Sequence, residues 1–186
     1  NGGSANWGMF LDLPAGTDPI CVTHLKTANT GAAGAAFSLD VYTFVGSGLG
    51  GPVGSGPGSS PTGWTLLGNA PGIQGPLGAT NGVSELIDIP DIFVPGGQTV
   101  GVALVFRTLG PRYFGTGTPA LSVFDDGVLR ATTGDVRSVP FTATGSFFSS
   151  RAMVGELHYY VVPEPASMAA LALGAGLLAL RRRRKV

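Results

Sequence analysis

Residues 98–107 read QTVGVALVFR, and this stretch gives the clearest indication of the fold. Val100, Val102, Leu104 and Phe106 fall at every second position, so one face of an extended segment is apolar. Successive side chains of a β-strand point to opposite faces, and this alternation therefore predicts a strand with one face in the core.

The same alternation recurs on both sides of this stretch. Residues 37–45 place Phe37, Leu39 and Val41 on one face, and residues 153–162 alternate in the same way. Further strands are predicted at 8–13, 20–27, 64–68, 84–89, 120–124 and 128–133. The turn signals between the strands are Gly31, Asn81-Gly82, Pro95-Gly96-Gly97 and Asp126-Gly127. Many short strands joined by Gly and Pro turns predict an all-β fold, an antiparallel β-sandwich or jelly roll, in a single domain over residues 1–162.

Residues 46–63 read GSGLGGPVGSGPGSSPTG and interrupt this pattern. Glycine and serine leave the backbone free, and the segment offers nothing large to bury. We expect a low-complexity loop that projects from the sandwich. Its first residues match G-x-G-x-x-G, but no helix and no acidic residue follow at the spacing of a dinucleotide site, so a flexible loop is the better interpretation.

The C-terminal part of the chain has a different composition. Residues 166–180 read ASMAALALGAGLLAL, carry no charge, and would span roughly 22 Å as a helix. This length is short for a bilayer core of about 30 Å, but Arg181, Arg182, Arg183, Arg184 and Lys185 can reach the headgroups at one end. We therefore predict a transmembrane helix at 166–180 with a basic tail at 181–185.

The cations also predict the orientation of this helix. Lys and Arg beside a span stay on the cytoplasmic side, so residues 1–162 are expected outside the cytoplasm. Residues 1–162 are called the body below. A tail anchor with a cytoplasmic body would draw five cations across the bilayer. A buried core helix would show a polar face at helical spacing, which this run lacks.

Three features follow one another here: Pro163-Glu164-Pro165, a short apolar run, and an arginine cluster. Together, as a domain over 163–186, they resemble the PEP-CTERM sorting signal of Gram-negative bacteria. The resemblance implies processing near Pro163-Glu164-Pro165 by exosortase, a membrane protease-transpeptidase. It also implies a transient stay in the inner membrane, followed by the cell surface or an extracellular polysaccharide matrix.

The body also resembles one group of PEP-CTERM ectodomains. The blocks that carry this resemblance are GMFLDL, LDVYTFVGS, GWTLLGN, VPGGQTVGVAL, LSVFDDGVLRATTG and SSRAMVGELHYYVVPEP. The resemblance implies location and fold, and it carries no biochemical activity.

Charge and cysteine content exclude several classes of protein. Residues 1–165 hold six basic and eleven acidic residues, a net charge of −5, which does not suit a nucleic-acid partner. Cys21 is the only cysteine, so neither an intramolecular disulfide nor a cysteine zinc site is expected. No charged and then apolar leader follows Asn1, and we expect an export leader to have been removed or to lie outside this sequence.

Few residues suggest chemistry. Asp125-Asp126-Gly127 could offer two carboxylates to calcium, but a hairpin turn is the preferred interpretation. Glu85, Asp88 and Asp91 lie at a strand end, where a shared face is not expected. The candidate bases, His24 and His158, occupy polar-facing strand positions with no hydrolase motif nearby.

We therefore expect no catalytic residues, no metal and no cofactor. The predicted function is an exported structural or interaction protein of the surface or matrix, not an enzyme. A secreted carbohydrate-binding module, with extracellular polysaccharide as partner, is one alternative, and a secreted hydrolase is another. The aromatic residues that could form a sugar-stacking platform are Trp7, Tyr42, Trp64, Tyr113, Tyr159 and Tyr160.

Overall fold

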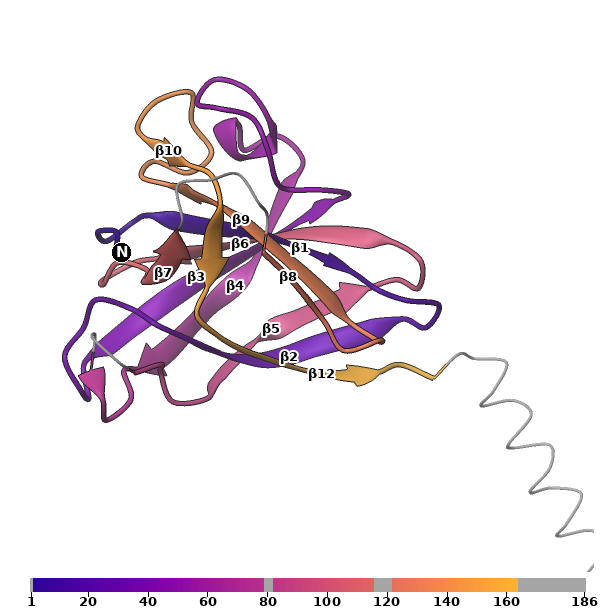
Figure 1. Cartoon of the computed structure of the whole chain (residues 1–186), viewed down its shortest axis with the longest axis horizontal. Helices are drawn as coiled ribbons and strands as arrows, with labels where there is room; N and C mark the ends of the chain where they lie inside the picture. The colour runs from indigo at the N-terminus through magenta and orange to yellow at the C-terminus, as the bar shows by residue number, and fades with distance from the viewer. Residues whose placement is uncertain (1, 79–81, 116–121, 164–186) are drawn as a thin grey trace, which may run out of the picture.

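The strands of this protein form two main antiparallel sheets that enclose the core (Figure 1). The structure is a computed structural model that describes residues 2–78, 82–115 and 122–163. Apart from single turns, such as the 3-10 turn η1 (Pro57–Ser59), the regular elements of these residues are β-strands. The all-β, antiparallel class predicted from the sequence is confirmed, and the predicted helix at 166–180 lies outside the described residues.

The larger sheet has seven strands and contains the alternating stretch at residues 98–107. Its order is β10 (Phe147–Phe148), β9 (Arg130–Arg137), β1 (Gly8–Pro14), β6 (Thr99–Phe106), β3 (Ala36–Val45) and β4 (Trp64–Ile73), with β8 (Ser122–Asp125) also paired to β9. β6 is central, and every residue from Val100 to Phe106 is buried because both of its faces are covered.

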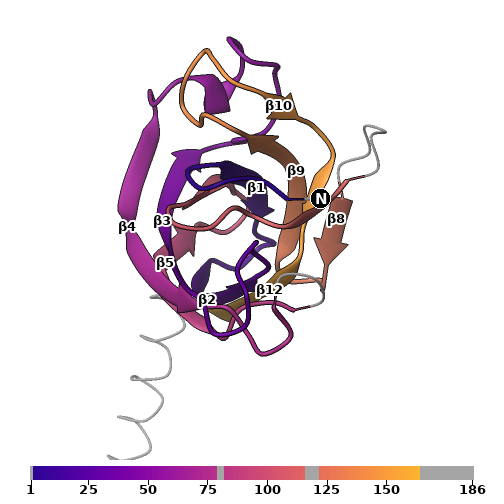
Figure 2. The same cartoon turned by 90° about the vertical axis from the view of Figure 1, so that its left-hand side faces the viewer.

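The smaller sheet has three strands in the order β12 (Gly155–Val161), β2 (Ile20–Thr27) and β5 (Ile87–Val94). A separate two-stranded ladder joins β11 (Arg151–Met153) to β7 (Tyr113–Gly115). Seen from the side, the strands surround a common interior (Figure 2). The buried residues of β6 and β3 pack there against those of β2 and β5.

The edges of the two sheets approach each other in two places, which are called seams below, and the two seams differ. At one seam, β4 and β5 lie in contact along the sheet edges. At the other seam, β8 pairs only with β9 and β12 pairs only with β2, so each of these strands ends its described sheet. The candidate site lies at this second seam.

Several strand bounds differ from the prediction. β4 continues to Ile73 rather than 68, and β5 covers Ile87–Val94 rather than 84–89. The strand predicted at 153–162 corresponds to β12, while β11, which shares only Met153 with it, and the short strands β7 and β10 were not predicted.

The segment 46–63 is a loop, as predicted, with η1 as its one regular element, but it is anchored to the sheet. The segment lies at one end of the larger sheet (Figure 1), where its backbone is hydrogen-bonded to buried side chains of β1 and β9. It also covers a large buried group, because Gly58 lies against Arg137, which is only 2% exposed. The loop is therefore an anchored part of the fold.

Candidate functional site

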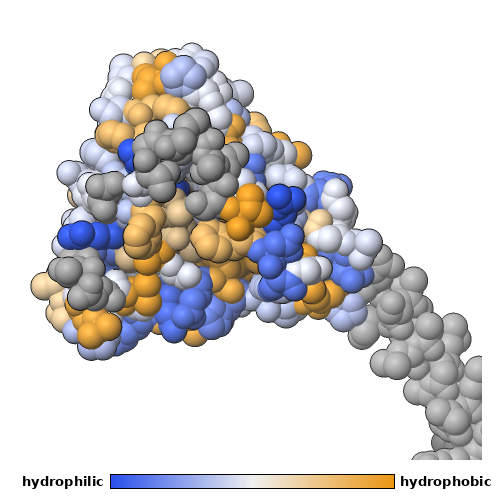
Figure 3. Space-filling model, viewed as in Figure 1, coloured by the Kyte–Doolittle hydropathy of each residue, from blue (hydrophilic) through white to orange (hydrophobic). Residues whose placement is uncertain are grey.

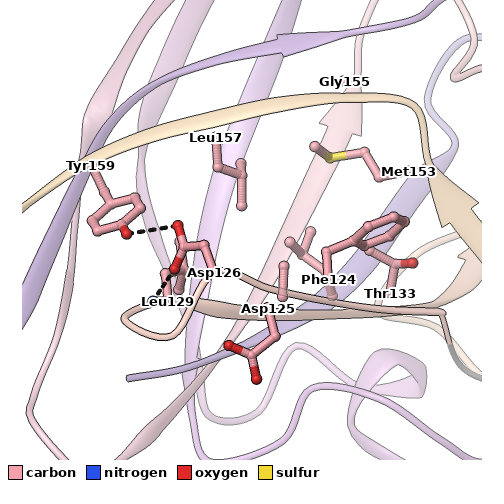
Figure 4. A pocket seen from close by; sticks show the side chains of 11 residues that line it. Phe124, Asp125, Asp126, Leu129, Thr133, Met153, Gly155, Leu157 and Tyr159 are labelled. Carbon is pink, nitrogen blue, oxygen red and sulfur yellow. Dashed lines mark hydrogen bonds between the residues drawn. The ribbon is translucent and has the colours of Figure 1, made fainter. Parts of the chain in front are cut away.

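A cavity of about 400 Å³ opens at the seam between the β8–β9 hairpin and the segment that carries β11 and β12 (Figure 4). Two of the residues that line it, Leu11 and Leu129, are buried. Phe124 of β8 borders one side, and Met153 and Leu157 border the other. The remaining lining residues are Asp125, Asp126, Ala131, Thr133, Gly155 and Tyr159. Most of this lining is apolar, as is usual for pockets that bind organic groups.

One hydrogen bond crosses the seam at an end of the cavity. The Tyr159 hydroxyl donates to Asp126 Oδ2 at 2.8 Å, and Figure 4 shows the two side chains meeting. Asp126 Oδ1 also accepts the backbone N–H groups of Val128 at 3.0 Å and Leu129 at 2.9 Å. These backbone bonds, with the Tyr159 hydroxyl, lower the pKa of Asp126. Burial and the bond to Asp126 raise the pKa of Tyr159. The pair is therefore a carboxylate and a neutral phenol near pH 7.

Asp125-Asp126-Gly127 forms the tip of the β8–β9 hairpin, as the sequence predicted. Gly127 has a φ of +89°, and its N–H donates to Asp125 Oδ1 at 2.8 Å. This positive φ is the reason for glycine at the turn. Within the described part of the chain, no three His, Cys, Asp or Glu side chains are grouped so that they could hold a metal ion.

The two histidines face each other in the smaller sheet. His24 of β2 and His158 of β12 are paired in register, and their side chains are 40% and 45% exposed. His24 Nδ1 lies 2.8 Å from Thr23 Oγ1, and His158 Nε2 lies 3.1 Å from Glu156 Oε2. The predicted polar-facing positions are confirmed. Their pairing was missed, because strand register cannot be obtained from either strand alone.

Charged neighbours surround this pair on the same sheet. Asp88 Oδ1 lies 3.8 Å from His24 Nε2, and Lys26 Nζ lies 3.2 Å from Glu156 Oε2. Bonds from His158 and Lys26 lower the pKa of Glu156. Such exposed ion pairs contribute little to stability.

The six aromatic residues that could have formed a sugar platform are dispersed. Trp64 and Tyr42 pack with Phe141 at ring-centroid distances of 5.3 Å and 4.7 Å. Trp7 is stacked on Phe148, and Tyr113 is buried. Tyr159 contacts Asp126, and Tyr160 is the most exposed of the six. No single row of stacked aromatic faces results.

A buried charged cluster lies under the Gly-rich loop. The Asp12 carboxylate accepts hydrogen bonds from Ser47 Oγ at 2.5 Å and from the Gly48 N–H at 2.8 Å. The Asp135 carboxylate accepts one from the Gly50 N–H at 2.7 Å. Burial raises the pKa of both carboxyls. Because these loop N–H groups already bond to the chain's own carboxylates, they are not free to cradle a phosphate, in agreement with the rejection of the G-x-G-x-x-G match.

Arg137 completes this cluster, and the sequence argument did not identify it. Its guanidinium donates to the carbonyl oxygens of Gly50 and Gly51, at 3.3 Å and 2.7 Å, and to Ser59 Oγ at 2.9 Å. It also lies 4.6 Å from the ring centroid of Phe147. Burial lowers the pKa of Arg137, and Asp135 opposes this shift. The role of this cluster is to attach the loop to the sheet.

The predicted sorting segment begins where the described fold ends. β12 ends at Val161, and the Val162 N–H donates to the Pro19 carbonyl oxygen at 2.8 Å. Pro163 follows and is exposed. Glu164, Pro165 and Arg181 to Lys185 lie outside the described residues. Within the described ranges, no helix has the length and apolar character needed to span a bilayer.

Residues 161–185 match the family model of the PEP-CTERM protein-sorting motif. The matched span contains every predicted sorting residue, from Pro163 through the basic tail. The PEP-CTERM motif implies export, membrane-linked sorting toward the cell surface, and processing by an exosortase-type membrane enzyme. Comparisons of the chain with curated proteins and with solved structures find no match.

Proposed function

We propose that this chain is a structural or interaction protein of the cell surface or extracellular matrix. Its body is held transiently at the inner membrane by a helix at 166–180, with Arg181–Lys185 fixing the orientation. Exosortase then processes the chain at Pro163-Glu164-Pro165. The observation that carries the proposal is the motif match at 161–185, which begins at the last residue of β12 in an all-β body.

The position of the motif relative to the fold supports this order of events. The last backbone hydrogen bond described for the body is that of Val162, so the Pro163-Glu164-Pro165 triplet begins at the next residue. Proline has no N–H and disfavours helix in the residue before it, so the sequence of Pro163-Glu164-Pro165 favours an extended conformation. An extended segment outside a folded domain is a suitable substrate for a protease.

We propose a non-enzymatic role for the body. The two groups that could act as bases near neutral pH, His24 and His158, contact Thr23 and Glu156 on an exposed sheet face. Neither of them lines the cavity. A hydrolase needs a nucleophile, a base and an orienting group in mutual contact. The dispersed aromatic residues give no specific reason to prefer carbohydrate binding.

The sorting proposal is tested by replacing Pro163, Glu164 and Pro165 with alanine in a host that carries an exosortase. The cations remain, so the orientation in the membrane is expected to be retained. The feature that the enzyme reads is removed, so an uncleaved, membrane-bound form is expected to accumulate. Cell fractionation and the intact mass of the protein measure both outcomes.

A contrasting variant replaces Arg181 to Arg184 with glutamine. Loss of these cations removes the stop and the orientation signal, so the chain is expected to leave the membrane fraction unprocessed. If the triple-alanine variant is cleaved at the normal site and rate, the motif has no role in processing and the proposal is wrong.

A further inference from the structure

Among the described residues, β8 and β12 each have a strand partner on one edge only, and their other edges border the seam that the Tyr159–Asp126 hydrogen bond crosses. An unpaired edge presents a row of backbone N–H and C=O groups that can bond to another strand. At the opposite seam, β4 and β5 lie in contact, so the two seams differ in whether there is room between the edges.

The cavity supplies apolar surface beside these edges. Leu157 and Tyr159 of β12 are partly buried and line the cavity, whereas the residues between and beside them are exposed. Phe124, which lines the facing side, is 55% exposed. Figure 3 shows hydrophobic residues in the centre of this face, with hydrophilic residues beside them. The volume of about 400 Å³ falls within the range of ligand pockets, roughly 300–1,000 Å³.

The two charged residues that line the cavity are both acidic, and Arg130 is paired in register with one of them, Asp125. Asp125 and Asp126 are the only charged residues among its lining, and both are exposed at the hairpin tip. The body also has a net charge of −5 over residues 1–165. An anionic ligand is therefore disfavoured, and a partner with a basic group near the hairpin tip is favoured.

We propose that this seam receives an extended segment of another polypeptide, which adds as a strand to the free edge of β12. Its alternate side chains are apolar and enter the cavity, and a Lys or Arg lies beside Asp125 and Asp126. Strand addition satisfies the backbone groups of an edge, while pockets for alternate side chains provide specificity. The inference concerns the folded body alone, so it stands or fails independently of the sorting proposal.

The other possible occupants fit the seam less well. A small apolar molecule would fill the cavity but leave the strand edges unpaired. A second copy of this chain, joined through the same seam on both protomers, would bring two Asp125-Asp126 turns to one interface, and like charges across an interface oppose association. A basic, alternating strand satisfies the edge, the cavity and the charge together.

The test uses the full chain in lipid nanodiscs and a labelled peptide, acetyl-Lys-Thr-Val-Thr-Val-Thr-Val-amide. We expect saturable binding and slower hydrogen exchange at the backbone amides of β12. A peptide with two central N-methylated residues keeps its side chains but loses the N–H donors, and it should bind at least about tenfold more weakly. A peptide with Glu in place of Lys should also bind more weakly.

Two protein variants make the test specific. Ala131→Phe fills the cavity and is expected to weaken binding by at least about tenfold. Val45→Phe adds the same ring at a position that is 87% exposed and outside the cavity lining, and it should leave binding unchanged. The N-methylated peptide tests the wild-type chain, so the proposal remains testable if Ala131→Phe fails to fold.

Three results would overturn the proposal. The first is no binding of the Lys-containing peptide up to about 1 mM. The second is equal binding of the N-methylated peptide, which would indicate an apolar-ligand pocket rather than strand addition. The third is self-association of the chain that Ala131→Phe abolishes without any peptide, which would assign the seam to a second copy.

Discussion

Arg137 shows how one charged side chain organises a segment without regular structure. The guanidinium is buried under Gly58 and donates to the carbonyls of Gly50 and Gly51. A buried charge is tolerated only when it is paired and its hydrogen-bonding groups are satisfied. Asp135, the loop carbonyls and Ser59 largely provide these partners, although Arg137 Nε is buried without one.

We predict that Arg137→Leu strongly destabilises the fold. The substitution removes the positive charge near Asp135 and leaves buried loop carbonyls without donors, and each buried group left unsatisfied costs about 1–3 kcal/mol. Arg107→Leu is the matched control, because Arg107 pairs with Asp40 at a side chain that is 41% exposed. That change should cost no more than about 1 kcal/mol. Chemical denaturation of the purified protein measures both, and equal losses would contradict the assigned role.

Sequence reasoning could not identify Arg137, because its partners are remote in the sequence. Ser59 lies 78 positions away, and no local pattern shows which end of a strand meets a particular loop. The hairpin at Asp125-Asp126-Gly127 was predictable, because its hydrogen bonds join residues two or three positions apart. Tyr159, the other end of the bond across the seam, was noted only as an aromatic residue.

The strands, too, were predictable only where the residues of the strand itself show the pattern. Residues 8–13, 20–27 and 98–107 were placed within a residue or so, because alternation reports burial on one face. β4 and β5 were misplaced because Pro71 and Pro90 lie inside them. Proline is accepted at a sheet edge, where its missing N–H needs no partner, and both strands are edges. β7 and β10 are too short to show alternation.

The loop 46–63 depends on glycine for close approach rather than for freedom of motion. A Cβ at Gly58 would lie 2.4 Å from Arg137 Nε. A low-complexity composition is thus compatible with an anchored segment when the glycines lie against buried side chains.

We predict that Gly58→Ala detaches part of this loop. The added methyl group and the buried guanidinium cannot both be accommodated, so the amides of Gly48 and Gly50 should exchange faster with solvent. Gly16→Ala is the control, since its Cβ would meet only the Val128 carbonyl oxygen, at an ordinary 3.5 Å. Native-state hydrogen exchange compares the two variants. Unchanged exchange in Gly58→Ala would show that the loop does not depend on this contact.

Within the described residues, the buried core runs from Met9 to Val136. All of these core residues except Leu129 belong to β-strands. Cys21 is buried as a free thiol, so burial of apolar surface, not a disulfide, stabilises the fold.

We predict that residues 1–162 alone are soluble and fold as an all-β domain. The far-ultraviolet circular dichroism spectrum should show strands and almost no helix, with one cooperative thermal transition. The matched comparison is the full chain in nanodiscs, whose melting temperature should be close to that of the shorter protein. A strongly helical spectrum, or a protein that precipitates without residues 163–186, would show that the body needs the tail.

The hydrogen bond between Val162 and Pro19 has a mechanical consequence for the proposed processing. Only residues 163–165 separate this bond from the predicted helix, and three extended residues reach about 10–11 Å. The body would then rest close to the headgroups, and the enzyme would have to cut in the narrow space beneath it. After cleavage, the new C-terminus would directly follow the end of β12. A surface molecule joined to this C-terminus would be connected to the domain without a flexible linker, so the attachment would fix the tilt of the domain on the surface.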